Sequence, residues 1–327
     1  MLVDPHGRTV RDLRISITDR CNFRCQYCMP AEGMQWVPRD EVLSFEEIER
    51  IARICVERYQ FTSIRLTGGE PTVRSHLPLL IERLAALGID LAMTTNGATL
   101  PLLAPDLKAA GLHRVNISLD SLRRDRFAEI TRRDRLNEVL EGIDAAVDAG
   151  FSPVKVNCVL MRGVNDDEIV DFARFGRERG VAVRFIEFMP LDADERWGAD
   201  RVVPVSEVIA AIEAAFPLVP QPPAERGSSP ASVWRYADGK GDVGVIGSVT
   251  QSFCGDCDRV RLTAEGKFRN CLFSVRETDL RAVLRSGGSD DDVAAAIEAE
   301  VGRKWAGHSI GQVTFIRPDR SMSQIGG

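Results

Sequence analysis

The chain has 327 residues, 44% of them apolar and 28% charged, which are ordinary values for a soluble globular protein. A formal net charge of −6 argues against general binding to nucleic acids, which favours a basic surface. No apolar run reaches the roughly 18 residues of a transmembrane helix, and the N-terminus lacks the architecture of a signal peptide. We therefore expect a cytoplasmic protein, without membrane association, whose thiols stay reduced.

Strand-like and helical segments alternate through residues 1–216. Apolar runs predict strands, and each is followed by a segment of helical periodicity, the first of which starts with a capping box at Ser44 and Glu47. Repeated strand–helix units predict parallel strands joined by crossovers, and hence an α/β fold with a partial (β/α)6 TIM-type barrel. The predicted strands are 13–17, 63–67, 91–95, 114–119, 154–160 and 181–189; the predicted helices are 44–59, 77–86, 102–110, 122–149 with breaks, 166–179 and 206–216.

The remaining residues, 217–327, are expected to form a smaller α+β domain. Residues 217–230 are rich in proline and predict a linker, so we set the boundary near residue 217. The segment 307–327 is expected to be an irregular tail. Further strands are predicted at 232–237 and 243–249, and further helices near 278–286 and 290–305.

Three cysteines follow the first predicted strand with the spacing C-x3-C-x2-C. We call Cys21, Cys25 and Cys28 the first cysteine set. Thiolates are soft ligands that suit an iron–sulfur cluster, and three is one fewer than the four that usually hold a cubane. One iron would then be open to an outside ligand. The alternatives are a zinc site, which wants four ligands and has no histidine nearby, and a disulfide set, which needs an oxidising compartment.

A second group of three thiols lies in the C-terminal part. Cys254, Cys257 and Cys271, the second cysteine set, also have no histidine close in the sequence. Two incomplete sets in one chain favour two open clusters, and a zinc knuckle completed from elsewhere is the alternative. The other two cysteines, Cys55 and Cys158, lie in apolar patterns and are expected in the core.

Polar residues fall at or just past nearly every predicted strand end, where the active site of such barrels lies. Residues 68–71 (Gly-Gly-Glu-Pro) follow the second strand. The glycines would allow a ligand to approach the backbone, and Glu70 could accept a hydrogen bond from a ligand ammonium group. The alternative is a tight turn with an exposed acid.

Basic side chains accompany the second cysteine set. Arg259 and Arg261 alternate along a predicted strand and so share a face, with Lys267 and Arg269 shortly after. Such a group favours an anionic substrate such as a phosphate, and a solvated basic face is the alternative. The arginines of 123–135 interleave with acids and predict a solvated helix surface.

Taken together, these motifs resemble those of the radical S-adenosylmethionine enzymes, and within them those of the GTP 3′,8-cyclases of molybdenum cofactor biosynthesis. The resemblance covers essentially the whole chain, including the terminal Gly326 and Gly327. It is carried by residues 11–30, 65–71, 94–97, 116–120, 184–189 and 252–262.

The resemblance implies two [4Fe-4S] clusters, with S-adenosylmethionine bound through its amino and carboxylate groups at the first cysteine set. The open iron of the second set would meet the guanine of GTP. The family often has lysine where this chain has Ser63, which leaves one phosphate contact in doubt. Residues matching the S-adenosylmethionine site are Tyr27, Gly69, Glu70, Ser118 and Met189, and residues matching the GTP site are Arg14, Arg65, Thr94, Lys155, Arg259, Val260 and Arg261.

The activity that the resemblance implies is conversion of GTP to 3′,8-cyclo-7,8-dihydro-GTP. A 5′-deoxyadenosyl radical would abstract hydrogen from C3′, and the ribose radical would attack C8. Implied partners are an electron donor, cyclic pyranopterin monophosphate synthase acting on the product, and a second copy in a homodimer. The alternatives are another radical enzyme with an auxiliary cluster and a zinc-binding protein without catalysis.

Overall fold

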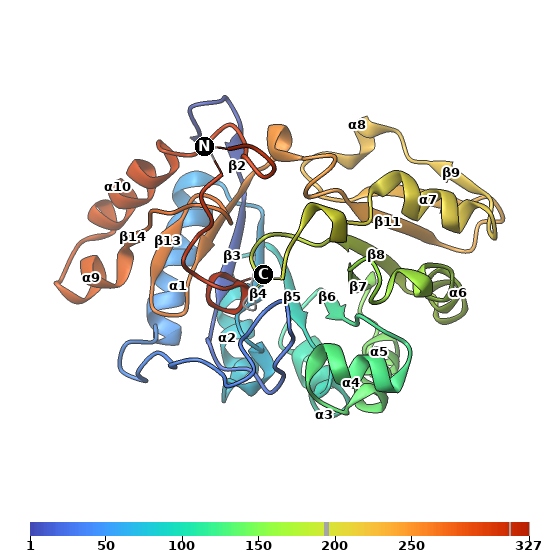
Figure 1. Cartoon of the computed structure of the whole chain (residues 1–327). Helices are drawn as coiled ribbons and strands as arrows, with labels where there is room; N and C mark the ends of the chain where they lie inside the picture. The colour runs from blue at the N-terminus through green and yellow to red at the C-terminus, as the bar shows by residue number, and fades with distance from the viewer. Residues whose placement is uncertain (193–195, 314, 327) are drawn as a thin grey trace.

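A single curved sheet organises the molecule (Figure 1). The computed structural model describes residues 1–192, 196–313 and 315–326. The six predicted strands of the barrel are confirmed, and neighbours in sequence are neighbours in space, all parallel. They are β3 (Asp12–Ser16), β4 (Ser63–Thr67), β5 (Asp90–Thr95), β6 (Arg114–Ser118), β7 (Val154–Leu160) and β8 (Ala182–Glu187).

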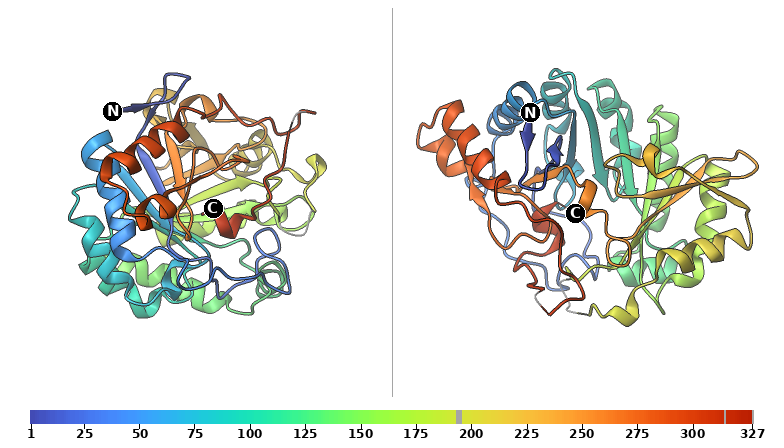
Figure 2. Two further views of the ribbon diagram at one scale, coloured as in Figure 1. Left: turned by 90° about the vertical axis from the view of Figure 1, so that its left-hand side faces the viewer. Right: turned by 90° about the horizontal axis from the view of Figure 1, so that it is seen from above.

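Helices cover the outer face of this sheet, as the view from above shows (Figure 2). In α1 the predicted capping box at Ser44 and Glu47 is present, and the helix buries Ile48, Ile51 and Ala52 against the strands. Within the described ranges, no helix has the length and apolarity needed to cross a membrane. The outer helices are α1 (Phe45–Arg53, continued by a π-helical turn at Ile54–Arg58), α2 (Leu77–Ala85), α3 (Leu100–Ala109), α4 (Arg124–Thr131), α5 (Leu136–Asp148), α6 (Ile169–Arg179) and α7 (Val205–Glu213).

The C-terminal strands extend the same sheet at both of its edges. β11 (Asp242–Ile246) pairs in parallel with β8, and β12 (Arg259–Leu262) pairs in parallel with β3. The sheet is therefore open, with the order β14-β13-β12-β3-β4-β5-β6-β7-β8-β11-β10-β9. The partial barrel is confirmed, whereas the division into domains at residue 217 stays a prediction. The outermost strands are β9 (Leu218–Pro220), β10 (Ser232–Tyr236), β13 (Lys267–Arg269) and β14 (Thr278–Asp279), and β1 (Leu2–Val3) pairs with β2 (Thr9–Val10) separately.

Several C-terminal details differ from the prediction. The proline-rich stretch is not only a linker, because it contains β9, paired with β10, and the short α8 (Pro223–Arg226). The helix α10 (Asp290–Val301) ends earlier than predicted, at Gly302, since glycine favours helix ends. Before it, α9 (Leu280–Arg285) starts only after β14.

The expected irregular tail ends in a helical turn, α11 (Met322–Ile325), with its own capping box at Ser321 and Gln324. It folds back to the carboxyl ends of β3 and β4, beside which the C-terminal mark lies in Figure 1. A Cβ on Gly326 would lie 2.7 Å from Ser16 Oγ, so only glycine fits there in this arrangement. Gly327 lies outside the described residues.

Candidate active site

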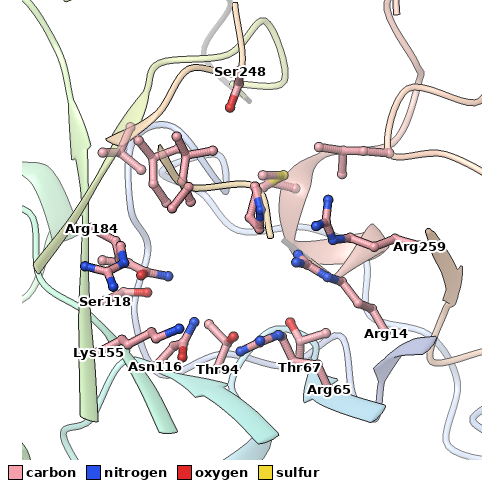
Figure 3. A pocket seen from close by; sticks show the side chains of 18 of the residues that line it. Arg14, Arg65, Thr67, Thr94, Asn116, Ser118, Lys155, Arg184, Ser248 and Arg259 are labelled. Atoms are coloured by element: carbon pink, nitrogen blue, oxygen red, sulfur yellow. The ribbon is translucent and has the colours of Figure 1, made fainter. Parts of the chain in front are cut away.

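A cavity of about 630 Å³ opens on the concave side of the sheet, a size typical of small-molecule sites. Both cysteine sets line it, together with residues from every strand from β3 to β8. Side chains from several strands converge on this space (Figure 3). Two thiol groups separated by more than 220 residues of chain therefore face one chamber.

The loop that carries the first cysteine set leaves β3 and is held by arginines. Arg24 Nη1 donates to the carbonyls of Cys21 and Phe23 at 2.6 and 2.7 Å. Arg132 Nη1 donates to the carbonyls of Arg24 and Met29 at 3.0 and 2.9 Å. The prediction that this arginine run is only a solvated surface is therefore wrong at Arg132, which braces the cysteine loop.

The thiols of the first set are suitable ligands for a metal cluster. All three are free cysteines. Burial raises the pKa of Cys21 to about 11 and that of Cys28 to about 12, and it raises the pKa of Cys25 well above its usual value. At neutral pH such thiols stay protonated until a metal takes the place of the proton. Within the described ranges, no three His, Cys, Asp or Glu side chains are grouped to hold a single metal ion.

The glycines after β4 allow two segments of the protein backbone to pack closely. A Cβ on Gly68 would lie 2.3 Å from Thr18 O, and one on Gly69 would lie 2.3 Å from Arg20 O. Gly69 N donates to Thr18 O at 2.7 Å, which ties the end of β4 to the start of the cysteine loop. Both glycines also line the cavity. The two glycines therefore allow the end of β4 to lie close to the cysteine loop, and they also allow a ligand to approach the backbone.

Glu70 is hydrogen-bonded within the protein at the ends of two strands, and it also lines the cavity. Its carboxylate, 1% exposed, accepts hydrogen bonds from the backbone and hydroxyl of Thr72, from Thr95 Oγ1 at 2.6 Å and from Asn96 N at 2.6 Å. Burial raises its pKa, and these donors oppose that shift. The carboxylate joins the ends of β4 and β5 and is not an exposed acid, whereas its hydrogen bond to a ligand ammonium group stays a prediction.

The other residues matched to S-adenosylmethionine lie around the first set. Tyr27, Ser118 and Met189 all line the cavity. The hydroxyl of Tyr27 donates to Asp120 Oδ2 at 2.7 Å. Burial raises the pKa of Asp120 to about 6, against the hydrogen bonds from Tyr27 and Val159 N that lower it.

Opposite the first set, six basic side chains form what we call the cation ring. Strand register brings them together, because Arg14 on β3 pairs with Arg65 on β4 and with Arg261 on β12. Thr94 pairs with Asn116, which pairs with Lys155, so polar side chains continue around the sheet. Ser63 lines the cavity too. The members of the cation ring are Arg14, Arg65, Lys155, Arg184, Arg259 and Arg261 (Figure 3, except Arg261).

Two members of the cation ring are paired with acids, since Arg184 Nη2 lies 2.6 Å from Asp242 and Arg259 Nε lies 3.6 Å from Asp12, but other members keep unused donors. Among the described residues, Arg14 Nε and both Nε and Nη1 of Arg65 are buried without a hydrogen-bond partner. Burial, followed by the charges of Arg261 and Arg259, lowers the pKa of Arg14 well below its usual value. Burial, followed by Arg184 and other arginines, lowers that of Lys155 to about 8. Cations that repel one another in this way are suited to an anionic ligand of several charges.

Strand β12 confirms the predicted alternation of side chains. Arg259 and Arg261 face the cavity, whereas Val260 is fully buried in the hydrophobic core. Arg259 donates to Ser228 O and lies over the ring of Phe253. Arg261 Nη1 donates to the carbonyls of Ile325 and Gly326, so the tail occupies it. Val260 does not line the cavity, and its place in the GTP-contacting segment 259–261 stays a prediction.

The second cysteine set lies beside the cation ring, with Cys257 Sγ 3.8 Å from Arg259 Nη1. Cys254 and Cys257 flank a single helical turn (Cys254–Asp256), and Cys271 follows β13. Burial alone would raise the pKa of Cys254, but hydrogen bonds from His308 and Ser252 outweigh it and lower the pKa to about 7. Burial raises the pKa of Cys271. These thiols are also free and suit a cluster.

Sequence reasoning missed three contributors to the cavity. Arg184 is a charged residue within an apolar parallel strand, and that contrast was a usable signal. His308 lies 37 residues after Cys271 and gave none. Residues 228–231, inside the predicted linker, also line the cavity.

Two family models match the chain. Residues 15–176 match the radical SAM superfamily, and residues 181–310 match a model described as Molybdenum Cofactor Synthesis C. Among solved structures, Streptococcus suis SuiB bound to its precursor peptide SuiA has a TM-score of 0.61 at 14% identity. That match covers 81% of this chain and 60% of SuiB, and it supports the fold alone.

Full-length relatives are more specific. A GTP 3′,8-cyclase of Mycobacterium sp. (strain KMS) is 50% identical over all of this chain and 93% of its own length. A GTP 3′,8-cyclase of Streptomyces coelicolor is 48% identical over all of this chain and 96% of its own length. With this identity over its whole length, the chain belongs to the GTP 3′,8-cyclase family of the radical SAM superfamily.

Proposed function

We propose that the protein converts GTP to 3′,8-cyclo-7,8-dihydro-GTP, the first step of molybdenum cofactor biosynthesis. One observation carries the proposal: a single cavity is lined by two three-cysteine sets and by six basic side chains, of which Arg14 and Arg65 keep buried donor atoms without partners among the described residues. Radical generation needs the cysteines, and a nucleoside triphosphate needs the cations. Membership of the family supports this substrate.

The first cysteine set would hold a [4Fe-4S] cluster with S-adenosylmethionine on its open iron, which supplies one-electron reductive cleavage of the sulfonium when bound. The chain supplies the surroundings. Tyr27, Ser118 and Met189 line that side of the cavity, and Glu70 fixes the strand ends around it. The burial of this loop keeps bulk water away from a reactive species.

The triphosphate would lie against the cation ring. Arg14 and Arg65 offer unused guanidinium donors, and arginine pairs with phosphate oxygens in a bidentate manner. Lys155 adds a charge from β7. Phosphate binding here would orient the ribose between the two cysteine sets, so that positioning limits which hydrogen the radical can take.

The second cysteine set would hold a second [4Fe-4S] cluster facing the guanine. Its free thiols, its place on the same cavity and the absence of a fourth cysteine nearby in the sequence support this reading. Further proposals, which follow from the family alone, are a homodimer, a cytoplasmic location, an external electron donor, and cyclic pyranopterin monophosphate synthase as the enzyme that takes the product.

The test is anaerobic incubation of reconstituted protein with GTP, S-adenosylmethionine and a strong reductant, followed by mass analysis. We expect 5′-deoxyadenosine, methionine and a product isomeric with GTP, and about eight irons per chain. Reductive cleavage without any change to GTP would instead indicate a radical enzyme with another substrate. Zinc in place of iron would indicate a protein without this catalysis.

A further inference from the structure

His308 lies against the second cysteine set, although the sequence places it far from those cysteines. His308 and Cys254 both line the cavity. The neighbouring Gly307 permits this approach. A Cβ there would lie 3.1 Å from Cys254 Cβ and 3.6 Å from its Sγ.

The imidazole is held in one orientation. Nδ1 accepts a hydrogen bond from Ile310 N at 3.3 Å, which leaves the ring proton of the neutral tautomer on Nε2. The ring packs against Phe273, with 5.2 Å between ring centroids. An imidazole with its proton on Nε2 is a donor toward sulfur, not a metal ligand.

The backbone around His308 is fastened to the same site. Lys304 Nζ, on a side chain that is 4% exposed, donates to the carbonyls of Arg259 and Asn270 at 2.6 Å each. Arg8 Nη1 donates to the carbonyls of Cys254 and Ala306 at 2.5 and 2.8 Å. These bonds hold residues 304–308 across the second cysteine set, so the position of His308 is over-determined.

We propose that His308 is a positioning residue of the second cluster: it donates a hydrogen bond to the Cys254 sulfur and raises the reduction potential of that cluster. The inference rests on the proposed second cluster. A hydrogen-bond donor withdraws negative charge from the ligand sulfur. It therefore stabilises the reduced cluster, which carries one more electron, more than the oxidised cluster. Arg259 acts in the same direction on Cys257, with 3.8 Å between Nη1 and Sγ.

Among the described residues, no arginine, lysine or histidine donates a hydrogen bond to a sulfur of the first cysteine set. Cys21 Sγ accepts from Phe23 N at 3.3 Å, a neutral backbone group. The two sites are therefore built with different donors to sulfur. The expected result is a second cluster that is easier to reduce than the first.

The test uses the full chain with all three first-set cysteines changed to alanine, which leaves only the second site to load with iron. Iron content of this background tests the proposed function: the absence of iron would remove the cluster itself, before His308 is considered. In the loaded protein, the midpoint potential is then measured by redox titration with electron paramagnetic resonance. His308→Phe keeps the ring packing and removes the donor, and His308→Gln keeps a donor.

We expect His308→Phe to retain iron and to shift the midpoint potential to a more negative value, and His308→Gln to lie nearer the parent. The control is His113→Phe, at the residue directly before β6, which should change nothing. An unchanged potential in iron-loaded His308→Phe would overturn the proposal. Loss of iron from both His308 variants, or a strong directly bonded nitrogen coupling in the parent spectrum, would make His308 a ligand and would also overturn it.

Discussion

The substitution Arg65→Met tests whether the cation ring lowers the stability of the folded protein while it raises the affinity for GTP. Arg65 lies between Arg14 on β3 and Ala92 on β5, and its Nε and Nη1 atoms are buried without partners among the described residues. Burial, which is only partly offset by the charge of Asp12, lowers its pKa. Without GTP, this guanidinium is an uncompensated cation.

Replacing a buried, poorly paired charge with an apolar side chain of similar length stabilises proteins by about 1–3 kcal/mol. For a chain of 327 residues, this corresponds to a rise in the melting temperature of roughly 1.5–4.5 °C. The same substitution should weaken GTP binding by about 2–5 kcal/mol, since it removes one partner of a buried charge pair. That is roughly 30-fold to several-thousand-fold in affinity.

The assays are thermal unfolding by circular dichroism and equilibrium binding of GTP, both under anaerobic conditions with iron content matched. Arg114→Met is the control, because Arg114 lines the same cavity but is paired with Asp90, with Nε at 3.0 Å from Oδ1. The control should not raise the melting temperature. A lower melting temperature for Arg65→Met, together with GTP affinity changed less than about fivefold (about 1 kcal/mol), would refute the reasoning.

Three further outcomes follow from the site. GTP affinity should fall as pH rises above about 8, because burial lowers the pKa of Lys155 to about 8 and phosphate binding above that pH requires uptake of a proton. Lys155→Arg should flatten this pH profile. An equal fall of affinity in the variant would exclude Lys155 as the origin of the pH dependence. Glu70→Gln should lower the free energy of unfolding by about 2–5 kcal/mol in urea denaturation, since an amide nitrogen would face donors of Thr72, Thr95 or Asn96, and an unchanged midpoint would contradict that role. Cys25→Ala should abolish 5′-deoxyadenosine formation and remove about half of the iron, whereas continued reductive cleavage would exclude the first cysteine set as its source.

Local patterns predicted the six barrel strands and the face on which the site lies. The apolar pattern of a strand depends only on residues that are neighbours in the sequence. In a parallel sheet, the polar residues that follow the strands lie together at one edge. The alternation in β12 likewise predicted that Arg259 and Arg261 share the cavity.

The remaining features depend on contacts between distant parts of the chain. Nothing in the sequence of β11 or β12 says that these strands join opposite edges of the barrel sheet. The return of the tail to Arg261 and the seat of His308 on Cys254 are set by packing across many residues. The hydrogen bonds that Glu70 accepts within the protein could not be predicted from the sequence, because its donors Thr95 and Asn96 come from a different strand end.

The most direct test of the central claim uses GTP deuterated at C3′ of the ribose. With S-adenosylmethionine and reductant, the account predicts 5′-deoxyadenosine one mass unit heavier and a GTP isomer that has lost the deuterium, because the cavity presents C3′ to the radical formed at the first cysteine set. Unlabelled 5′-deoxyadenosine formed together with consumption of GTP would contradict the account.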